Sequence, residues 1–297
     1  MARRRNPDRV FFELAPEFRD PETAAAVILP VPYDRGSSWK RGADRGPEAI
    51  LEASTYVEAW DLETASEPFR RGIATLEPLV FAGSPEDLEP RVAAAVGTWL
   101  DRGRLPVVVG GNHAVPIGAI AAMADRFSDS CVLQIDAHGD TRESYHGSTH
   151  NHACVMARAR ERCPIVQVGI RSVDTSEVAG LDSERVFFAH RIVAEPDDGW
   201  MDRVVDLLAP RVHVTIDVDA FDPAIVPATG TPEPGGLDWY QVTGLLARVA
   251  RSRRVVAFDV VELLPGHHAS AFTAAKLIYR FLAEIFQHDR GEDRPVD

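Results

Sequence analysis

Seven short apolar runs are the feature of this sequence that most constrains its fold. They are rich in Val and Ile, and most are apolar throughout instead of alternating between apolar and polar residues. Such runs are typical of strands that are buried on both faces. They occupy residues 25–31, 105–111, 131–136, 164–170, 185–190, 211–217 and 253–261.

Longer segments with apolar residues at helical spacing lie between these runs. They occupy residues 46–60, 85–103, 238–252 and 270–288. Strands that alternate with helices predict one mostly parallel sheet covered by helices, a three-layer α/β/α fold. No internal repeat or linker divides the chain, so we expect a single domain over residues 1–297, with residues 1–24 as an N-terminal extension or arm.

The net charge indicates which partners to expect, and the cysteines and the N-terminal segment indicate the compartment. The formal net charge is −13, from 45 acidic against 32 basic residues, so neither nucleic acid nor an anionic membrane is an expected partner. No stretch has the length of a membrane-spanning helix, and the N-terminus lacks the apolar segment of a secretory signal. The three cysteines form no C-x-x-C motif, which suits a reducing compartment. We therefore expect a cytoplasmic protein.

Ionisable side chains gather where three of the predicted strands end. They are His113 after the second run, Asp136, His138 and Asp140 at the end of the third, and Asp217 and Asp219 at the end of the sixth. Residues two apart in a strand share a face, and ligands of parallel sheets bind beyond the carboxyl ends of the strands. We therefore expect these two imidazoles and four carboxylates to converge at one edge of the sheet.

This set of side chains predicts a metal site. Oxygen and imidazole ligands without thiolate favour Mn²⁺ or a similar divalent ion, with Zn²⁺, Fe²⁺ and Co²⁺ as open alternatives. Six ligands are too many for one open catalytic ion and suit two ions about 3.5–4 Å apart. A single Asp at a strand end more often forms a turn or a helix cap. That explanation would have to hold independently at three strand ends, so we favour the metal site.

The segments around these residues resemble the ureohydrolases, the family of arginase and agmatinase. GGNHA at 110–114, DAHGD at 136–140 and TIDVDAFDPAIVPATGTPEPGG at 215–236 are similar to the three metal motifs of that family. The resemblance extends to residues 31–51 and 258–265, and residues 269–282 resemble the closing helix of the agmatinase branch. It implies an arginase/deacetylase-like fold, a single ureohydrolase domain and a homo-oligomer, either a trimer or a hexamer.

The resemblance also implies a role for each ligand. One Mn²⁺ would bind His113, Asp136, Asp140 and Asp217, and the other would bind Asp136, His138, Asp217 and Asp219, so that Asp136 and Asp217 bridge the two ions. Two Mn²⁺ per chain are thus the expected cofactors. The family usually has Asp or Glu where this chain has Asn112, which is not itself an expected ligand.

The expected reaction is the Mn-dependent hydrolysis of a guanidino compound to urea and an amine. The ions would lower the pKa of a bound water molecule, and the resulting hydroxide would attack the guanidinium carbon. Asp140 would take the proton of this water and pass it to the leaving amine. Glu262 is a natural carboxylate partner for a guanidinium, and it resembles the substrate glutamate of the family. His152 resembles the family histidine thought to shuttle protons, with His146 and His150 as nearby alternatives. We expect Asp259 to support the site from behind.

Agmatine is the expected substrate and putrescine the expected product, a step of polyamine biosynthesis. The loop at 141–151 should face the tail of the substrate, where Glu143 would attract an amine. Asp174 is a further candidate for substrate binding. Arg142 is evidence for a different substrate. If its side chain faces the pocket, it would favour a guanidino acid such as guanidinobutyrate, guanidinopropionate or arginine. Arg142 can instead pair with Glu143 or with an outer Asp.

Three alternatives remain at this stage. A metallophosphoesterase also uses DxH, GD and GNH segments, but its usual order puts DxH before GNH, the reverse of the order here. A single-zinc deacetylase on a related fold would leave His113, Asp140 and Asp219 as surplus ligands. A non-catalytic family member is the third alternative, and Asn112 alone favours it.

Overall fold

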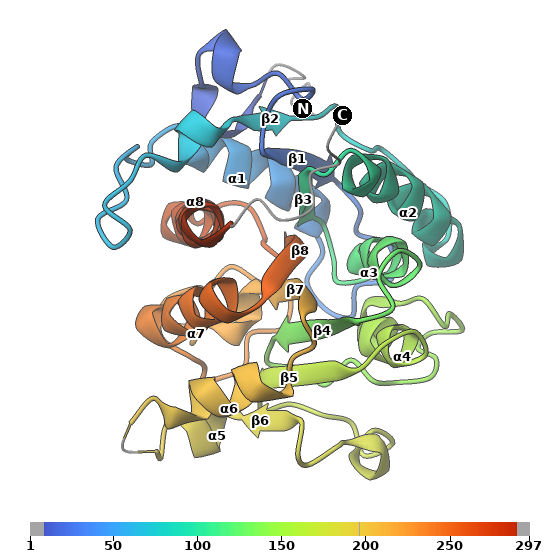
Figure 1. Ribbon diagram of the computed structural model, residues 1–297. Helices are drawn as coiled ribbons and strands as arrows, with labels where there is room; N and C mark the ends of the chain where they lie inside the picture. Colours follow the sequence, from blue (N-terminus) through green and yellow to red (C-terminus); the bar gives the residue numbers. More distant parts are fainter. Residues whose placement is uncertain (1–8, 196, 290–297) are drawn as a thin grey trace.

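Eight parallel strands form one sheet in the order β2-β1-β3-β8-β7-β4-β5-β6 in the computed structural model, which describes residues 9–195 and 197–289 (Figure 1). The strands are β1 (Ala26–Val31), β2 (Ile73–Thr75), β3 (Leu105–Gly110), β4 (Ser130–Ile135), β5 (Ile165–Ile170), β6 (Val186–Phe188), β7 (Arg211–Asp217) and β8 (Arg254–Val261). Every residue of β1, β3 and β4 is buried, because helices cover both faces of the sheet.

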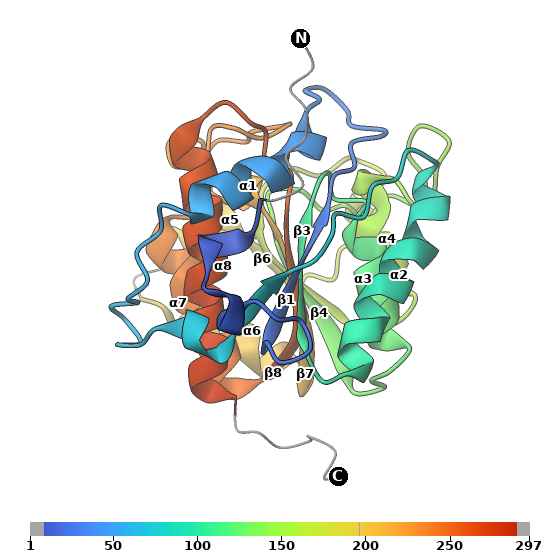
Figure 2. The same cartoon turned by 90° about the horizontal axis from the view of Figure 1, so that it is seen from above.

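Helices form a layer on each side of the sheet, with α2, α3 and α4 on one face and α1, α7 and α8 on the other (Figure 2). The helices are α1 (Gly46–Ser54), α2 (Pro85–Asp101), α3 (Pro116–Ala124), α4 (Val155–Arg160), α5 (Ala189–Ile192), α6 (Gly199–Leu207), α7 (Trp239–Ser252) and α8 (His268–His288). Short 3-10 helices are η1 (Phe11–Glu13), η2 (Pro16–Phe18), η3 (Ala43–Arg45), η4 (Pro68–Arg71), η5 (His152–Cys154), η6 (Val178–Gly180) and η7 (Val218–Ala220). The predicted three-layer α/β/α fold is confirmed.

The differences from the predicted elements are local. All seven predicted runs contain a strand, but β2 was missed because three residues carry too little pattern. The helix predicted over 46–60 ends at Ser54, and Tyr56 beyond it is 75% exposed instead of facing the core. Helices α3, α4, α5 and α6 also lie outside the four helical segments predicted from the sequence. None of the helices in the described ranges combines the length and the apolar character that a bilayer-spanning helix needs.

The predicted N-terminal arm is described only from residue 9, and residues 1–8 lie outside the described residues. Its described part packs against the body of the protein. Phe11 is buried in the main hydrophobic core, and Phe12 stacks on Tyr279 of α8 with ring centroids 4.4 Å apart. Aromatic burial of this kind stabilises a segment that has little regular structure of its own.

Gly111 lets the chain after β3 pass close to the segment after β1. A Cβ at this position would lie 1.7 Å from the carbonyl oxygen of Tyr33, and the neighbouring Asn112 amide donates to that same oxygen at 2.8 Å. We expect Gly111→Ala to lower the free energy of unfolding by about 3 kcal/mol or more, because backbone must move. Gly103→Ala is the comparison: no heavy atom lies within 4 Å of its Cβ position, and only its φ of 65° adds a cost, of about 1–2 kcal/mol. Chemical denaturation measures both, and equal losses would contradict this account of Gly111.

Candidate metal centre and substrate cavity

The six predicted metal ligands and Glu262 lie at or just beyond the carboxyl ends of four neighbouring strands, β3, β8, β7 and β4. His113 follows β3, Glu262 follows β8, Asp217 is the last residue of β7, and Asp136 follows β4. Neighbouring strands are about 4.8 Å apart, so side chains from these four ends can meet. The strand order therefore brings together residues that are far apart in the sequence.

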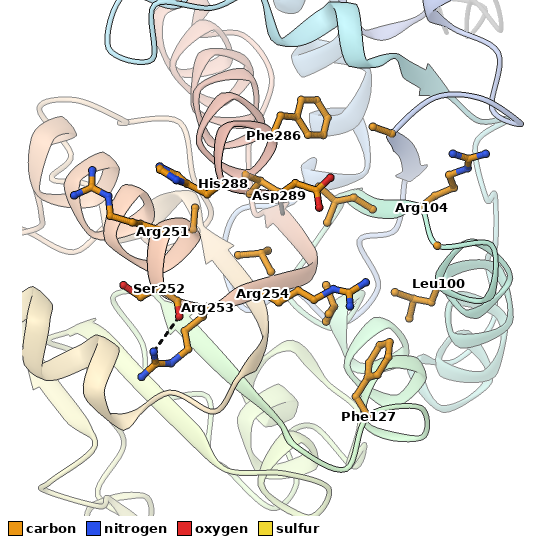
Figure 3. Close-up of a pocket in the computed structure, with 17 residues that line it drawn as sticks. Leu100, Arg104, Phe127, Arg251, Ser252, Arg253, Arg254, Phe286, His288 and Asp289 are labelled. Atoms are coloured by element: carbon orange, nitrogen blue, oxygen red, sulfur yellow. Dashed lines mark hydrogen bonds between the residues drawn. The ribbon is translucent and has the colours of Figure 1, made fainter. Parts of the chain in front are cut away.

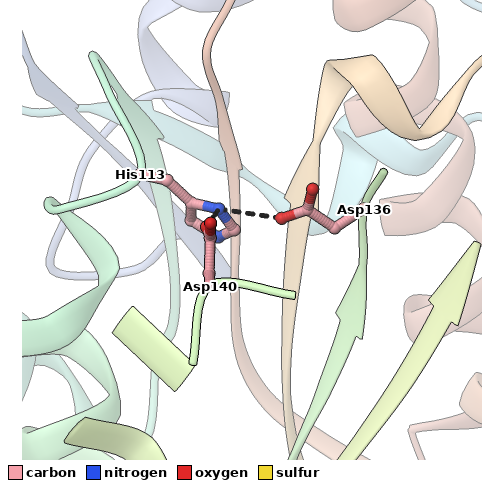
Figure 4. A group of neighbouring side chains, drawn as sticks. All are labelled: His113, Asp136 and Asp140. Atoms are coloured by element: carbon pink, nitrogen blue, oxygen red, sulfur yellow. Dashed lines mark ion pairs between the residues drawn. The ribbon is translucent and has the colours of Figure 1, made fainter. Parts of the chain in front are cut away.

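One group of ligand atoms surrounds the ring of His113 (Figure 4). Its Nδ1 lies 3.0 Å from Asp136 Oδ2, 3.0 Å from Asp140 Oδ2 and 3.6 Å from Asp217 Oδ2. All four side chains are buried, and Nδ1 has no hydrogen-bond partner among the described residues. A buried nitrogen without a partner, facing several carboxylate oxygens, is an arrangement that a cation fits.

A second group lies on the other side of Asp136. His138 Nδ1 is 2.9 Å from Asp219 Oδ2 and 3.7 Å from Asp136 Oδ1. His113, Asp136 and Asp140 form one set of potential ligands, and Asp136, His138 and Asp219 form another. Asp136 belongs to both sets and turns one oxygen to each. The geometry thus fits two cations that share Asp136.

Turns, and not the strand pleat, bring these ligands together. We expected Asp136, His138 and Asp140 to share one face of a strand, and this explanation was wrong because β4 ends at Ile135. Instead, Asp136 Oδ1 accepts a hydrogen bond from the His138 amide at 2.6 Å, and Asp217 Oδ1 accepts one from the Asp219 amide at 2.8 Å. Such Asp-centred turns are favourable locally, because the side chain replaces a backbone acceptor.

The electrostatics of the cluster show an excess of negative charge. Burial, together with Asp219 and Asp136, raises the pKa of Asp217 well above its usual value. Burial and the charge of Asp136 likewise raise the pKa of Asp140 to about 6. Burial opposes the charged form of His113, but contacts with Asp136 and Asp140 outweigh it and raise the His113 pKa. Carboxylates crowded in this way are stabilised when cations bind among them.

Glu262 lies between this cluster and the cavity beside it. Its Oε1 accepts a hydrogen bond from the His113 backbone amide at 2.9 Å, and burial raises its pKa to about 8. Glu262 and Asp140 have positive φ angles, 64° and 50°, which are uncommon for residues other than glycine. Backbone strain of this kind concentrates at functional sites, where the surrounding structure holds it in place.

The cavity next to the cluster has a volume of about 280 Å³. Its walls include Trp39, Tyr145 and His152 as well as the candidate ligands other than Asp136. His152 Nε2 lies 3.0 Å from the hydroxyl oxygen of Ser38. Burial, together with nearby His113 and His138, lowers the pKa of His152 to about 4, so this ring is neutral. Ser38 and Trp39 were not among the site residues predicted from the sequence. Both lie in residues 31–51, and the resemblance of that segment to the family was the only indication that they belong to the site.

Arg142 lines the cavity, but acidic neighbours already pair with its charge. It lies 3.4 Å from Asp174 Oδ2 and 3.4 Å from Glu177 Oε1, and its guanidinium is 4.7 Å from the ring centre of Tyr145. Sequence reasoning missed Glu177. The structure does not bring Glu143 into the cavity wall: this exposed side chain pairs instead with two arginines of α4, Arg158 and Arg160.

Asn112 does not face the ligand cluster. Its side-chain amide donates to the Arg35 carbonyl at 3.1 Å, and its Oδ1 accepts from the Ala114 amide at 3.3 Å. The side chain thereby holds the segment that leads to Ser37 and Ser38 in the cavity wall. An amide is suited to this role because it both donates and accepts.

A second cavity, of about 370 Å³, lies at the opposite edge of the sheet, near the amino ends of β1, β3 and β8 (Figure 3). Arginines line much of it, but the Arg253 guanidinium donates to the carbonyls of Leu208, Val205 and Ser252. No residue that the sequence singled out for function lies in its wall.

A parallel sheet with two histidine–carboxylate groups at its carboxyl edge is the architecture of an arginase-like protein with a metal centre. A family model described as the arginase family matches residues 24–284. The chain belongs to the arginase family, and it is a ureohydrolase, an enzyme that hydrolyses the C–N bond of an amidino group. This membership also excludes the metallophosphoesterase alternative.

Similar proteins cover most of the chain. The N(1)-aminopropylagmatine ureohydrolase of Synechocystis sp. is 37% identical over 273 residues, which span 87% of this chain and 88% of that protein. The enzyme of the same name from Thermus thermophilus is 39% identical over 263 residues, 87% of this chain and 89% of that protein. The crystal structure of the agmatine ureohydrolase of Thermoplasma volcanium matches with a TM-score of 0.85 and 31% identity, covering 93% of this chain and 94% of that one. The expected arginase-like fold is confirmed.

Proposed function

We propose that this ureohydrolase acts on a guanidino amine, N1-aminopropylagmatine first and agmatine second, and releases urea and a polyamine. The observation that carries the proposal is the pairing of Arg142 with Asp174 and Glu177 at the cavity wall. An arginine held in this way is not free to bind a substrate carboxylate, whereas the two acidic groups favour a cationic tail. The names of the relatives that are 37% and 39% identical support N1-aminopropylagmatine over agmatine.

The proposed cofactors are two Mn²⁺ ions per chain. His113, Asp136, Asp140 and Asp217 would hold one ion, and Asp136, His138, Asp217 and Asp219 would hold the other. The donor set of carboxylates and imidazoles without thiolate supports this choice of metal. When bound, such ions lower the pKa of water toward about 7 and so supply a nucleophile at neutral pH.

The remaining roles belong to residues of the cavity. We assign Glu262 to the guanidinium, because a carboxylate matches its paired N–H groups and the bound cation favours the ionised carboxylate. Asp140 lies at the boundary of cluster and cavity, where it can take a proton from water and return it to the leaving amine. His152 is neutral and faces the same cavity, so it can accept a proton there and carry it to solvent.

The substrate preference is tested with a panel of four compounds. We expect kcat/KM for N1-aminopropylagmatine and agmatine to exceed that for 4-guanidinobutyrate and arginine by about 100-fold, because a substrate carboxylate beside acidic groups costs several kcal/mol. Urea release at one Mn²⁺ concentration measures all four.

Variants of Arg142 decide whether this residue binds the substrate. Arg142→Ala should leave the preference for amines in place, because Asp174 and Glu177 remain. Arg158→Ala is the matched control, since Arg158 pairs with Glu143 away from the cavity wall. If 4-guanidinobutyrate is the better substrate and Arg142→Ala removes its advantage, then Arg142 binds a carboxylate and the proposal is overturned.

We also propose that the chain is one ureohydrolase domain that assembles into a trimer or a hexamer. Large apolar side chains on the surface support an assembly, among them Tyr56 at 75% and Leu62 at 84% exposure. Light scattering coupled to size-exclusion chromatography measures the number of copies directly.

A further inference from the structure

A line of buried hydrogen bonds runs from His113 away from the cavity, through β7 and β8. His113 Nε2 lies 2.9 Å from Thr215 Oγ1, and Thr215 Oγ1 lies 2.7 Å from Asp259 Oδ1. The other oxygen of Asp259 lies 2.6 Å from His213 Nε2. Thr215 pairs directly with Asp259 across the two strands, and His213 shares a strand face with Thr215. All four side chains are 0% or 1% exposed.

The chemistry of these groups sets the direction of each hydrogen bond. A carboxylate accepts hydrogen bonds and does not donate them, and the Thr215 hydroxyl donates its single O–H to Asp259 Oδ1. The Thr215 oxygen is then left as an acceptor, and its partner His113 must donate from Nε2. His113 Nε2 therefore carries a proton, and when the ring is neutral the lone pair is on Nδ1. Nδ1 is the atom that faces Asp136 and Asp140 at 3.0 Å.

His213 completes the line at its far end. A buried carboxylate is costly unless its oxygens accept hydrogen bonds. Thr215 serves one oxygen of Asp259, and His213 Nε2 serves the other. Both oxygens of Asp259 thus accept hydrogen bonds. This leaves Thr215 as the donor to Asp259 and as the acceptor from His113.

We propose that Thr215 and Asp259 are positioning residues that fix the neutral tautomer of His113, so that Nδ1 is the nitrogen left to bind a cation. The inference rests on the proposed metal site. It explains why a histidine nitrogen is buried among carboxylates without a hydrogen-bond partner in the described residues. Partners behind a metal ligand commonly change metal affinity about 10–100-fold when they are removed.

The test compares Thr215→Val with Thr215→Ser. Valine keeps the shape of threonine but loses the hydroxyl, whereas serine keeps the hydroxyl. We expect Thr215→Val to weaken the binding of Mn²⁺ to the metal-free protein by about 10–100-fold, and Thr215→Ser to stay within about threefold of wild type. Calorimetric titration with MnCl₂ measures the affinity, and circular dichroism checks that each variant is folded.

The tautomer itself gives a second readout that a merely structural role would not produce. Burial is outweighed by the acidic neighbours, which raise the His113 pKa, so the nitrogen chemical shifts of ¹⁵N-histidine-labelled, metal-free protein are followed upward in pH until the ring loses its second proton. The neutral ring should then be protonated on Nε2 in wild type and in Thr215→Ser, and should be a mixture of tautomers in Thr215→Val. Asp259→Asn, which places an N–H donor among groups arranged around an acceptor, should also disturb the His113 signal and weaken Mn²⁺ binding.

The outcomes separate this inference from the proposed metal site. A folded Thr215→Val that binds Mn²⁺ as wild type does, or a neutral wild-type His113 ring protonated on Nδ1, would overturn the inference. Wild-type protein that binds no Mn²⁺ would overturn the metal site, while the tautomer measurement would still test the hydrogen-bond line. If Thr215→Val fails to fold, the His113 nitrogen chemical shifts of wild type and of Asp259→Asn test the inference instead.

Discussion

Asp136→Ala should remove both metal ions and lower kcat by more than about 1,000-fold, because Asp136 is shared by both groups of ligands. One of its oxygens lies 3.0 Å from His113 Nδ1, and the other lies 3.7 Å from His138 Nδ1. The measurement is metal content after desalting, by mass spectrometry, together with urea release.

Variants of other ligands make this prediction sharper. Asp219 belongs to only one of the two groups, so Asp219→Ala should keep about one ion per chain. Asp217→Ala, which removes the other proposed bridge, should behave like Asp136→Ala. Asp125→Ala is the control, since this exposed aspartate pairs with Arg162 at the surface. Two ions retained in Asp136→Ala, or full activity after chelation, would refute the shared site.

Glu262→Gln should lose turnover by about 1,000-fold while both ions remain bound. Glutamine can still accept the hydrogen bond from the His113 amide, now 2.9 Å from Glu262 Oε1, so the side chain should stay in place. What is lost is the negative charge opposite the guanidinium. Hydrogen bonds to charged groups contribute about 1.5–3 kcal/mol each, and two of them correspond to a loss of this size.

The control for Glu262 is Glu143→Gln. Glu143 is exposed, pairs with Arg158 and lies outside the cavity wall, so this variant should have near wild-type kinetics. Metal content and kcat/KM are measured on both variants. Wild-type kinetics in Glu262→Gln would mean that another carboxylate binds the guanidinium, and a loss of metal would mean that Glu262 supports the ions.

Elements with strong local patterns were predictable from the sequence. The run at 105–111 is apolar throughout because β3 lies inside the sheet with helices on both sides. Strand β2, of three residues at the edge of the sheet, carries no such pattern and was missed. Helix α1 ends earlier than its apolar spacing suggested, because Tyr56 faces outward and periodicity alone does not say where the core lies.

By itself, the sequence determined which groups could do chemistry and where along the chain they stand. Asp136, His138 and Asp140 occur within five residues, and local Asp-centred turns are enough to bring such neighbours together. The composition of that set, oxygen and imidazole without thiolate, already indicated the kind of metal.

Only the tertiary structure decided which groups face one another. It placed Glu177 beside Arg142, 35 residues away in the sequence, and left Glu143 outside the cavity. It also joined His113 to Thr215 across 102 residues, and Thr215 to Asp259 across 44. These pairings depend on the order of the strands, which arises from packing the whole sheet between its helices. Local propensity carries no information about that order, because it acts over only a few residues of the chain.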